Sequence, residues 1–191
     1  MNAGTLKKAK VYPVHDIHAH LHGELTVNLP AFHAITGCDS VSHLSGIGKR
    51  SAWKIFCSNI HLLNNLGMGE LTEQVVSTAE TFICRLYNLT NVDKCDQARA
   101  LLFCKCKAQE SLPPTSDAVK LHIQRAHFQA LIWNSAFDAR PQLPDPTTHT
   151  WNLDCGKLVP MLMTLPAMPE MCKEIIACGC LKGCLLQRCS C

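Results

Sequence analysis

Residues Gly37–Phe56 read GCDSVSHLSGIGKRSAWKIF and place a Gly-x-Gly turn, at Gly46 and Gly48, between two short helical patterns. Glycine lacks a Cβ atom, so the turn can adopt left-handed backbone angles and bring its N–H groups close to an anion. The helix expected after the turn points its positive N-terminus at the same place, where Lys49 and Arg50 add cationic donors. The segment predicts a phosphate-gripping unit that reads no bases. The alternative is an ordinary glycine turn with a solvated basic pair.

The rest of the chain predicts a mainly α fold. Apolar residues recur at spacings of three and four in residues 71–86 and 119–137, which is typical of amphipathic helices. A shorter helix is expected at about 93–104, and Ser116 is expected to be the N-cap of the longest helix. Beyond the prolines at 141–146, a small β-hairpin is expected near 150–162. We therefore expect a helical bundle containing a helix-hairpin-helix, this β-hairpin and a cysteine-rich irregular tail.

Proline clusters divide the chain into three regions, because helices cannot continue through them. The expected division is a helical region with the helix-hairpin-helix at 1–112, a helix plus short hairpin at 113–165, and a cysteine-rich tail at 166–191. With 191 residues and 47% hydrophobic content, the chain can bury one moderate core or two small ones.

Composition also limits the compartment and the class of partner. No run of about 18 uncharged apolar residues and no signal peptide is visible, so the sequence predicts no membrane span and an intracellular protein. The expected location is nuclear or cytoplasmic, with the nucleus favoured. The 13 cysteines are then expected to be buried thiols or metal ligands rather than a disulfide framework. A net charge of +3 is too mild to establish a nucleic-acid partner by itself.

The triplet Gly37-Cys38-Asp39, a spacer, Gly46-Ile47-Gly48 and a basic pair resemble the helix-hairpin-helix of the flap endonuclease and excision-repair nuclease superfamily. The resemblance implies that Lys49 and Arg50 contact DNA phosphates, that loop carbonyls bind a monovalent cation, and that Asp39 is one of several carboxylates holding two divalent cations. Two-metal hydrolysis needs a cluster of carboxylates. Only Asp16 and Glu24 precede the motif, so we expect a vestigial Asp39, no magnesium site in this chain alone and no catalytic residue.

A wider resemblance covers nearly the whole chain. The segments Tyr12–Ile17, Leu29–Asp39, Leu121–Ala126 and Trp151–Asp154, with Trp133, are similar to a family of transposon-derived animal proteins. In that family a nuclease-like domain precedes the hairpin and a cysteine-rich domain follows it. The resemblance implies a chain that is trimmed at both ends.

The cysteine tail resembles the first half of the tesmin-type CXC domain, a zinc module that contacts DNA. Thiolates at such short spacings can share a tetrahedral zinc ion. The expected zinc ligands are Cys178, Cys180, Cys184, Cys189 and Cys191. The alternative is an oxidation-prone end that binds no metal.

A second metal-like pattern, Asp16-x-His18-x-His20, occurs at the first strand of amidohydrolase barrels, where alternate side chains bind zinc. Such a barrel needs about 250 residues and alternating strands and helices, which this sequence lacks. The flanking segment also predicts a helix. We therefore expect at most an adventitious metal-binding histidine cluster here.

Together these patterns predict sequence-independent binding to the DNA backbone by a catalytically incomplete, nuclease-related remnant. One alternative is a structural or protein-interaction fragment that binds no DNA. Another is a metal-dependent nuclease whose missing carboxylates come from a partner chain or an upstream nuclease-like domain.

Overall fold

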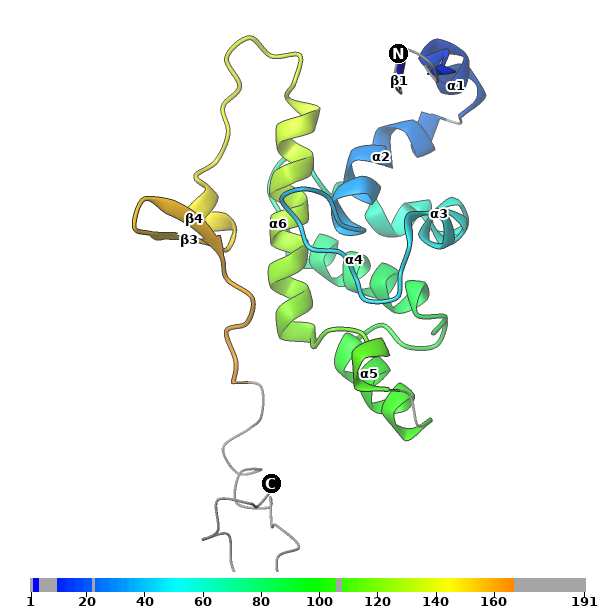
Figure 1. The fold of residues 1–191 in the computed structure, drawn as a ribbon, viewed down its shortest axis with the longest axis vertical. Coiled ribbons are helices and arrows are strands. Elements are labelled where there is room, and N and C mark those ends of the chain that lie inside the picture. Colours follow the sequence, from blue (N-terminus) through cyan, green and yellow to red (C-terminus); the bar gives the residue numbers. More distant parts are fainter. Residues whose placement is uncertain (1, 4–9, 22, 106–107, 167–191) are drawn as a thin grey trace, which may run out of the picture.

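The computed structural model describes residues 2–3, 10–21, 23–105 and 108–166. Six α-helices are the main elements of this part of the chain (Figure 1): α1 (Val14–His20), α2 (Gly23–Ile35), α3 (Lys49–Ser58), α4 (Glu73–Leu86), α5 (Cys95–Cys104) and α6 (Ser116–Asn134). Three short 3-10 helices accompany them: η1 (Ile60–Leu63), η2 (Gln109–Ser111) and η3 (Pro146–His149). The predicted mainly α fold is confirmed.

The strands form two small antiparallel pairs in the described residues. Strand β1 (Asn2–Ala3) pairs with β2 (Lys10–Val11), and β3 (Trp151–Asp154) pairs with β4 (Lys157–Pro160). The second pair confirms the β-hairpin expected near 150–162. Its two-residue turn, Cys155-Gly156, has φ angles of 46° and 76°, the left-handed backbone that such tight hairpins require.

Helix α6 is the centre of the packing. It lies against α2 and α4 on one side, and the β3–β4 hairpin lies on its other side (Figure 1). Its fully buried residues Val119, Ile123, Ala126 and Ala130 belong to the same hydrophobic cluster as residues of α2, α3 and α4. Side chains from both sides of the proline pair at 113–114 therefore share one core.

A buried carboxylate joins α4 to the two helices that follow it. Glu80 is 5% exposed and accepts hydrogen bonds from the Cys95 backbone N–H at 2.8 Å, the Lys94 ammonium at 3.0 Å and the Ser116 hydroxyl at 2.5 Å. These donors compensate for the desolvation of the charge, which would otherwise oppose folding. The contact fixes the first turns of α5 and α6 on α4.

Three local expectations were wrong. The N-cap of α6 is Thr115, whose hydroxyl accepts from the Ala118 N–H at 3.3 Å, whereas Ser116 is the first helical residue and bonds to Glu80. Phe137 is fully exposed because α6 ends at Asn134. Residues 37–48 form turns and bends rather than a short helix, so the helix before the Gly-x-Gly turn is α2.

Among the described residues, no helix is both long enough and apolar enough to cross a membrane. The longest, α6, carries Lys120, His122, Arg125 and His127 among its apolar residues.

Candidate phosphate-binding site at the start of helix α3

The loop between α2 and α3 is held from within and from three other elements. Its Val41 and Leu44 side chains are buried, and the Cys38 N–H donates to the Val41 carbonyl at 2.8 Å. Its outer contacts reach α6, the 3-10 helix η2 that follows α5, and the C-cap of α4. Ser40 donates to Gln129, Ser45 donates to the Glu110 carbonyl at 2.6 Å, and the Tyr87 hydroxyl donates to the Ser45 carbonyl at 3.3 Å. These contacts give the Gly46-Ile47-Gly48 turn a fixed backbone.

The two glycines of the turn have different backbone requirements. Gly46 has φ of +72°, in the left-handed region, and a Cβ atom there would meet nothing within 4 Å. Gly48 has extended angles, φ −89° and ψ 153°, and is the N-cap of α3. The left-handed geometry expected of the turn therefore applies to Gly46 alone. Gly48, which has no side chain, cannot cap the backbone N–H groups at the start of α3.

The N-terminus of α3 has no side-chain cap and no acidic residue in its first turn, whereas the other five described α-helices each have an acidic residue there. Ser51 does not supply a cap, because its hydroxyl donates to the Gly48 carbonyl at 2.8 Å. The first backbone N–H groups of a helix carry a partial positive charge and need an acceptor. This arrangement suits an anion.

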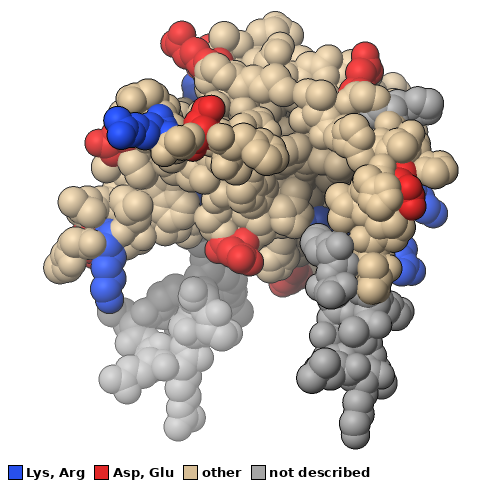
Figure 2. Space-filling view, turned by 90° about the horizontal axis from the view of Figure 1, so that it is seen from above, with Lys and Arg blue, Asp and Glu red and all other residues tan. Residues whose placement is uncertain are grey.

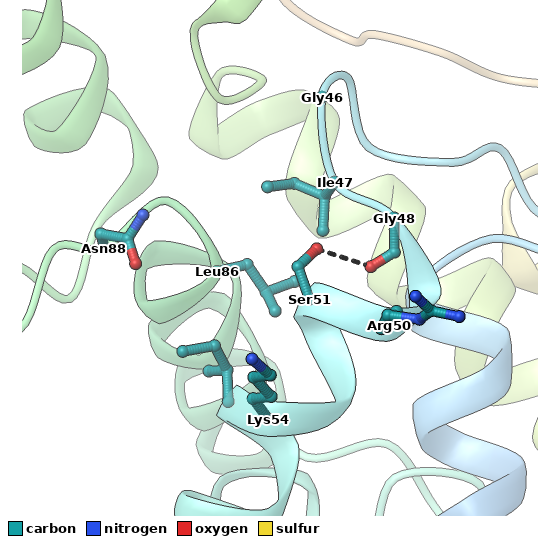
Figure 3. A pocket seen from close by; sticks show the side chains of 9 residues that line it. Gly46, Ile47, Gly48, Arg50, Ser51, Lys54, Leu86 and Asn88 are labelled. Atoms are coloured by element: carbon teal, nitrogen blue, oxygen red, sulfur yellow. Dashed lines mark hydrogen bonds between the residues drawn. The ribbon is translucent and has the colours of Figure 1, made fainter.

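The helix start opens on a cavity of about 590 Å³. Its lining combines the turn and α3 with the end of α4: Gly46, Ile47, Gly48, Arg50, Ser51, Lys54, Ile55, Leu86 and Asn88. Figure 3 shows Ile47, Leu86 and Asn88 facing one another across the opening, while Arg50 extends outward from α3. The lining contains two cations and no carboxylate.

Lys49 does not face this cavity, although the sequence placed it among the phosphate contacts. Its ammonium donates to the His33 carbonyl at 2.6 Å and the Thr36 hydroxyl at 2.7 Å, and lies 5.9 Å from the centre of the Phe32 ring. A cation at this place stabilises the carbonyl end of α2. Burial against α2 lowers the pKa of Lys49, with a small opposing effect from Cys38. The Lys49 ammonium is thus already bonded within the fold, to the C-terminal end of α2.

Arg50 and Lys54 remain available. Both are exposed, and neither side chain has a hydrogen-bond or ion-pair partner within the part of the chain that the structure describes. Their spacing of four places them on one face of α3. The sequence analysis missed Lys54 and Ser51, although the same spacing from Arg50 could have indicated Lys54. Asn88 comes from the end of α4, and only the tertiary fold brings it to the cavity.

Charged side chains are scattered on one face of the molecule. On the face seen in Figure 2, Lys and Arg side chains stand apart, separated by broad neutral surface and in places beside Asp or Glu. Such a face offers little long-range attraction to a polyanion, so anion binding on it would have to come from a few well-placed groups.

The predicted metal ligands are not brought together in the described residues, which contain no group of three or more His, Cys, Asp or Glu that could hold a metal ion. Asp39 is exposed; its charge raises the pKa of His33, which burial and Lys49 lower more strongly. His18 and His20 lie on helix α1 rather than on a strand. The tail ligands Cys178, Cys180, Cys184, Cys189 and Cys191 lie outside the described residues.

Gly37→Ala is expected to lower the free energy of unfolding by about 2–3 kcal/mol, from left-handed backbone strain and overpacking. Gly37 has φ of +99°, and a Cβ atom would lie 2.6 Å from the His43 Cα. Gly46→Ala is the matched control and should cost only about 1 kcal/mol of strain, because the space around it is open. Urea unfolding of both variants measures the difference; equal losses would contradict this account of the triplet glycine.

No protein-family model, curated protein or solved structure matches the chain. The resemblance to the flap endonuclease hairpin therefore depends on the residues quoted from this sequence. What the site can do has to be argued from its geometry.

Proposed function

We propose that the turn at 45–48 and the first turns of α3 bind the phosphate backbone of nucleic acid without reading its sequence. The observation that carries this proposal is the start of α3, which has no side-chain cap and opens on a cavity. Among the described residues, that cavity is lined by Arg50 and Lys54, which have no partner there, and by no carboxylate. Helix N-termini and mobile cations together are the usual protein groups for a phosphate.

The proposal also covers the kind of nucleic acid, the cellular location and the cofactors. DNA is the favoured nucleic acid because of the hairpin resemblance, and a nuclear location fits that partner. Catalysis is not proposed, since two-metal hydrolysis needs a cluster of carboxylates and the described residues contain no group of three or more His, Cys, Asp or Glu that could hold a metal ion. Zinc on the tail cysteines remains a prediction of the CXC resemblance, and a monovalent cation at loop carbonyls remains a prediction of the hairpin resemblance. They would add affinity without changing the role of α3.

The role of Lys49 differs here from the one expected from the sequence. A lysine that already caps α2 would lose two hydrogen bonds if it turned to a phosphate. We therefore assign the salt-dependent contacts to Arg50 and Lys54, and a positioning role to Lys49.

The double variant Arg50→Ala/Lys54→Ala should weaken binding to a labelled DNA duplex and to a branched DNA alike, because both lose backbone contacts. Each lost phosphate contact lowers the slope of log affinity against log salt by about 0.9, so the slope should fall by roughly 2. Fluorescence anisotropy with the full chain, Zn²⁺ supplied, across a salt series measures it.

Lys49→Ala is the control for this experiment. It should leave the salt slope unchanged and lower the thermal stability of the fold instead, because it removes the cap on α2. A folded wild-type chain that binds neither DNA would refute the proposal and leave a structural or protein-interaction fragment. A slope that falls with Lys49→Ala but not with the double variant would refute the assignment of residues.

A further inference from the structure

A second cavity, of about 270 Å³, adjoins the one at α3. The two cavities share four lining residues, Gly46, Ile47, Leu86 and Asn88, and we call the surface that lines both cavities the groove. At one end the groove reaches Arg50 and Lys54 on α3. At the other end it reaches Tyr87 and Leu102. Contacts with the phosphates of a duplex need only an exposed cationic surface, so this groove requires another explanation.

The groove offers apolar walls and polar edges. Leu86 is 5% exposed and Ile47 and Ile55 are half-buried, so they present carbon surface to an occupant. Asn88 is exposed at the rim, and its side chain has no hydrogen-bond partner in the described part of the chain. Its amide can both donate and accept. Unpaired bases are recognised by this combination, an apolar or aromatic surface for the ring faces and hydrogen bonds for the edges.

Tyr87 adds an aromatic ring to the second cavity. Its hydroxyl is already held by the Ser45 carbonyl, so the ring orientation is fixed. Burial raises the pKa of this phenol to about 12, and it stays uncharged at neutral pH. An uncharged ring does not repel the phosphates of a bound strand.

Charge favours a polyanion over an apolar peptide as the occupant. No Asp or Glu lines either cavity, and the cations stand at one end of the groove beside the uncapped start of α3. An occupant with a phosphate at the cationic end and a ring further along would match both the charge of that end and the apolar walls of the groove. One nucleotide of a single strand has this layout.

We infer that the groove receives an unpaired nucleotide, with its phosphate toward Arg50 and Lys54 and its base between Ile47 and Leu86. The inference rests on the proposed phosphate site and narrows its ligand to single-stranded nucleic acid or to an unpaired nucleotide within a duplex. Paired bases remain stacked inside a helix and cannot enter the groove.

The test compares a labelled 12-residue oligothymidylate with a 12-residue chain of abasic phosphodiester units, which carries the same charge and no bases. At one salt concentration the full chain should bind the oligothymidylate at least about fivefold more tightly, the lower end of what one stacked base contributes. A blunt duplex should show no such gain. Anisotropy titrations measure all three affinities.

Two variants separate the groove from the phosphate contacts. Asn88→Gly keeps the left-handed backbone, since Asn88 has φ of +61°, and removes the amide; it should reduce the preference. Ile55→Trp places a large ring in the first cavity and should abolish the preference while abasic binding persists, with circular dichroism establishing that each variant is folded.

The outcomes distinguish this inference from the proposed function. Equal affinity for the oligothymidylate and the abasic chain, with salt-dependent binding retained, overturns the nucleotide groove alone and leaves the groove to a protein partner. A preference that survives in Ile55→Trp also overturns it. Binding to neither strand by a folded chain overturns both proposals together.

Discussion

Phe56→Ala is expected to lower the free energy of unfolding by about 3–5 kcal/mol, the range for truncating a buried aromatic side chain. Phe56 is 0% exposed and fixes α3 to the rest of the bundle. Its ring stacks on Phe32 of α2, with centroids 4.6 Å apart, and meets Phe82 of α4 edge to face at 6.5 Å. The cavity left by truncation would lie between three helices, so collapse of the surrounding side chains could fill little of it.

The neighbouring Cys57 provides the control. It lies on the same helix and is exposed, so Cys57→Ala should change the unfolding free energy by less than about 0.5 kcal/mol. Urea unfolding, followed by tryptophan fluorescence because Trp53 contacts Phe56, measures both variants. Similar losses in the two variants would mean that α3 is not docked as described. Loss of nucleic-acid binding in Phe56→Ala would then carry no information about Arg50 and Lys54.

The periodic parts of the sequence predicted their structure well. The apolar spacing at 71–86 corresponds to α4, which begins at Glu73 after a Thr72 N-cap, and the spacing at 119–137 corresponds to α6. The turn residues Cys155-Gly156 marked the β-hairpin. In each case the signal is local, because a helix face or a tight turn is specified by residues close together in the chain.

The parts that failed depend on contacts between distant residues. Lys49 is adjacent to the Gly-x-Gly turn in sequence, yet its ammonium bonds to His33 and Thr36 across the loop. Residues 37–48 need no helix because contacts with Gln129 and Tyr87 hold them instead. No spacing rule identifies such partners. The helix-hairpin-helix pattern directed attention to this loop, and its DNA binding stays a prediction; the local sequence could not indicate that the Lys49 ammonium bonds to α2.

The candidate site also depends on a histidine, His122, that was not predicted to be a site residue. His122 of α6 is 4% exposed, and its Nε2–H donates to the Ile35 carbonyl at 2.8 Å. With the Lys49 bond to His33, this contact satisfies the carbonyl end of α2 immediately before the loop. The pH at which His122 becomes charged should therefore limit the stability of the site.

Stability should fall by about 2 kcal/mol between pH 7 and pH 5, and by about 3 kcal/mol by pH 4, through His122 alone. Burial, the largest cause, and the nearby Arg125 lower its pKa from 6.5 to about 4, against a smaller opposite effect of the Ile35 hydrogen bond. The unfolded chain therefore binds the proton first as the pH falls. The contribution is fully present above pH 6.5 and is lost on the way down to pH 4. Urea unfolding at several pH values measures it.

His122→Gln separates this effect from other titrating groups. Glutamine keeps an N–H donor for the Ile35 carbonyl and removes the ionisation, so the variant should lose more than half of the pH dependence. A residual slope of the same sign is expected from His127, because burial also lowers its pKa and its Nδ1 accepts from the Gly67 N–H at 2.9 Å, which requires a neutral ring. Wild-type stability that is equal at pH 7 and pH 5 would show that His122 is not buried against α2. The loop that presents Gly46 and Gly48 would then lack the support of His122 and keep only its Gln129 contact with α6.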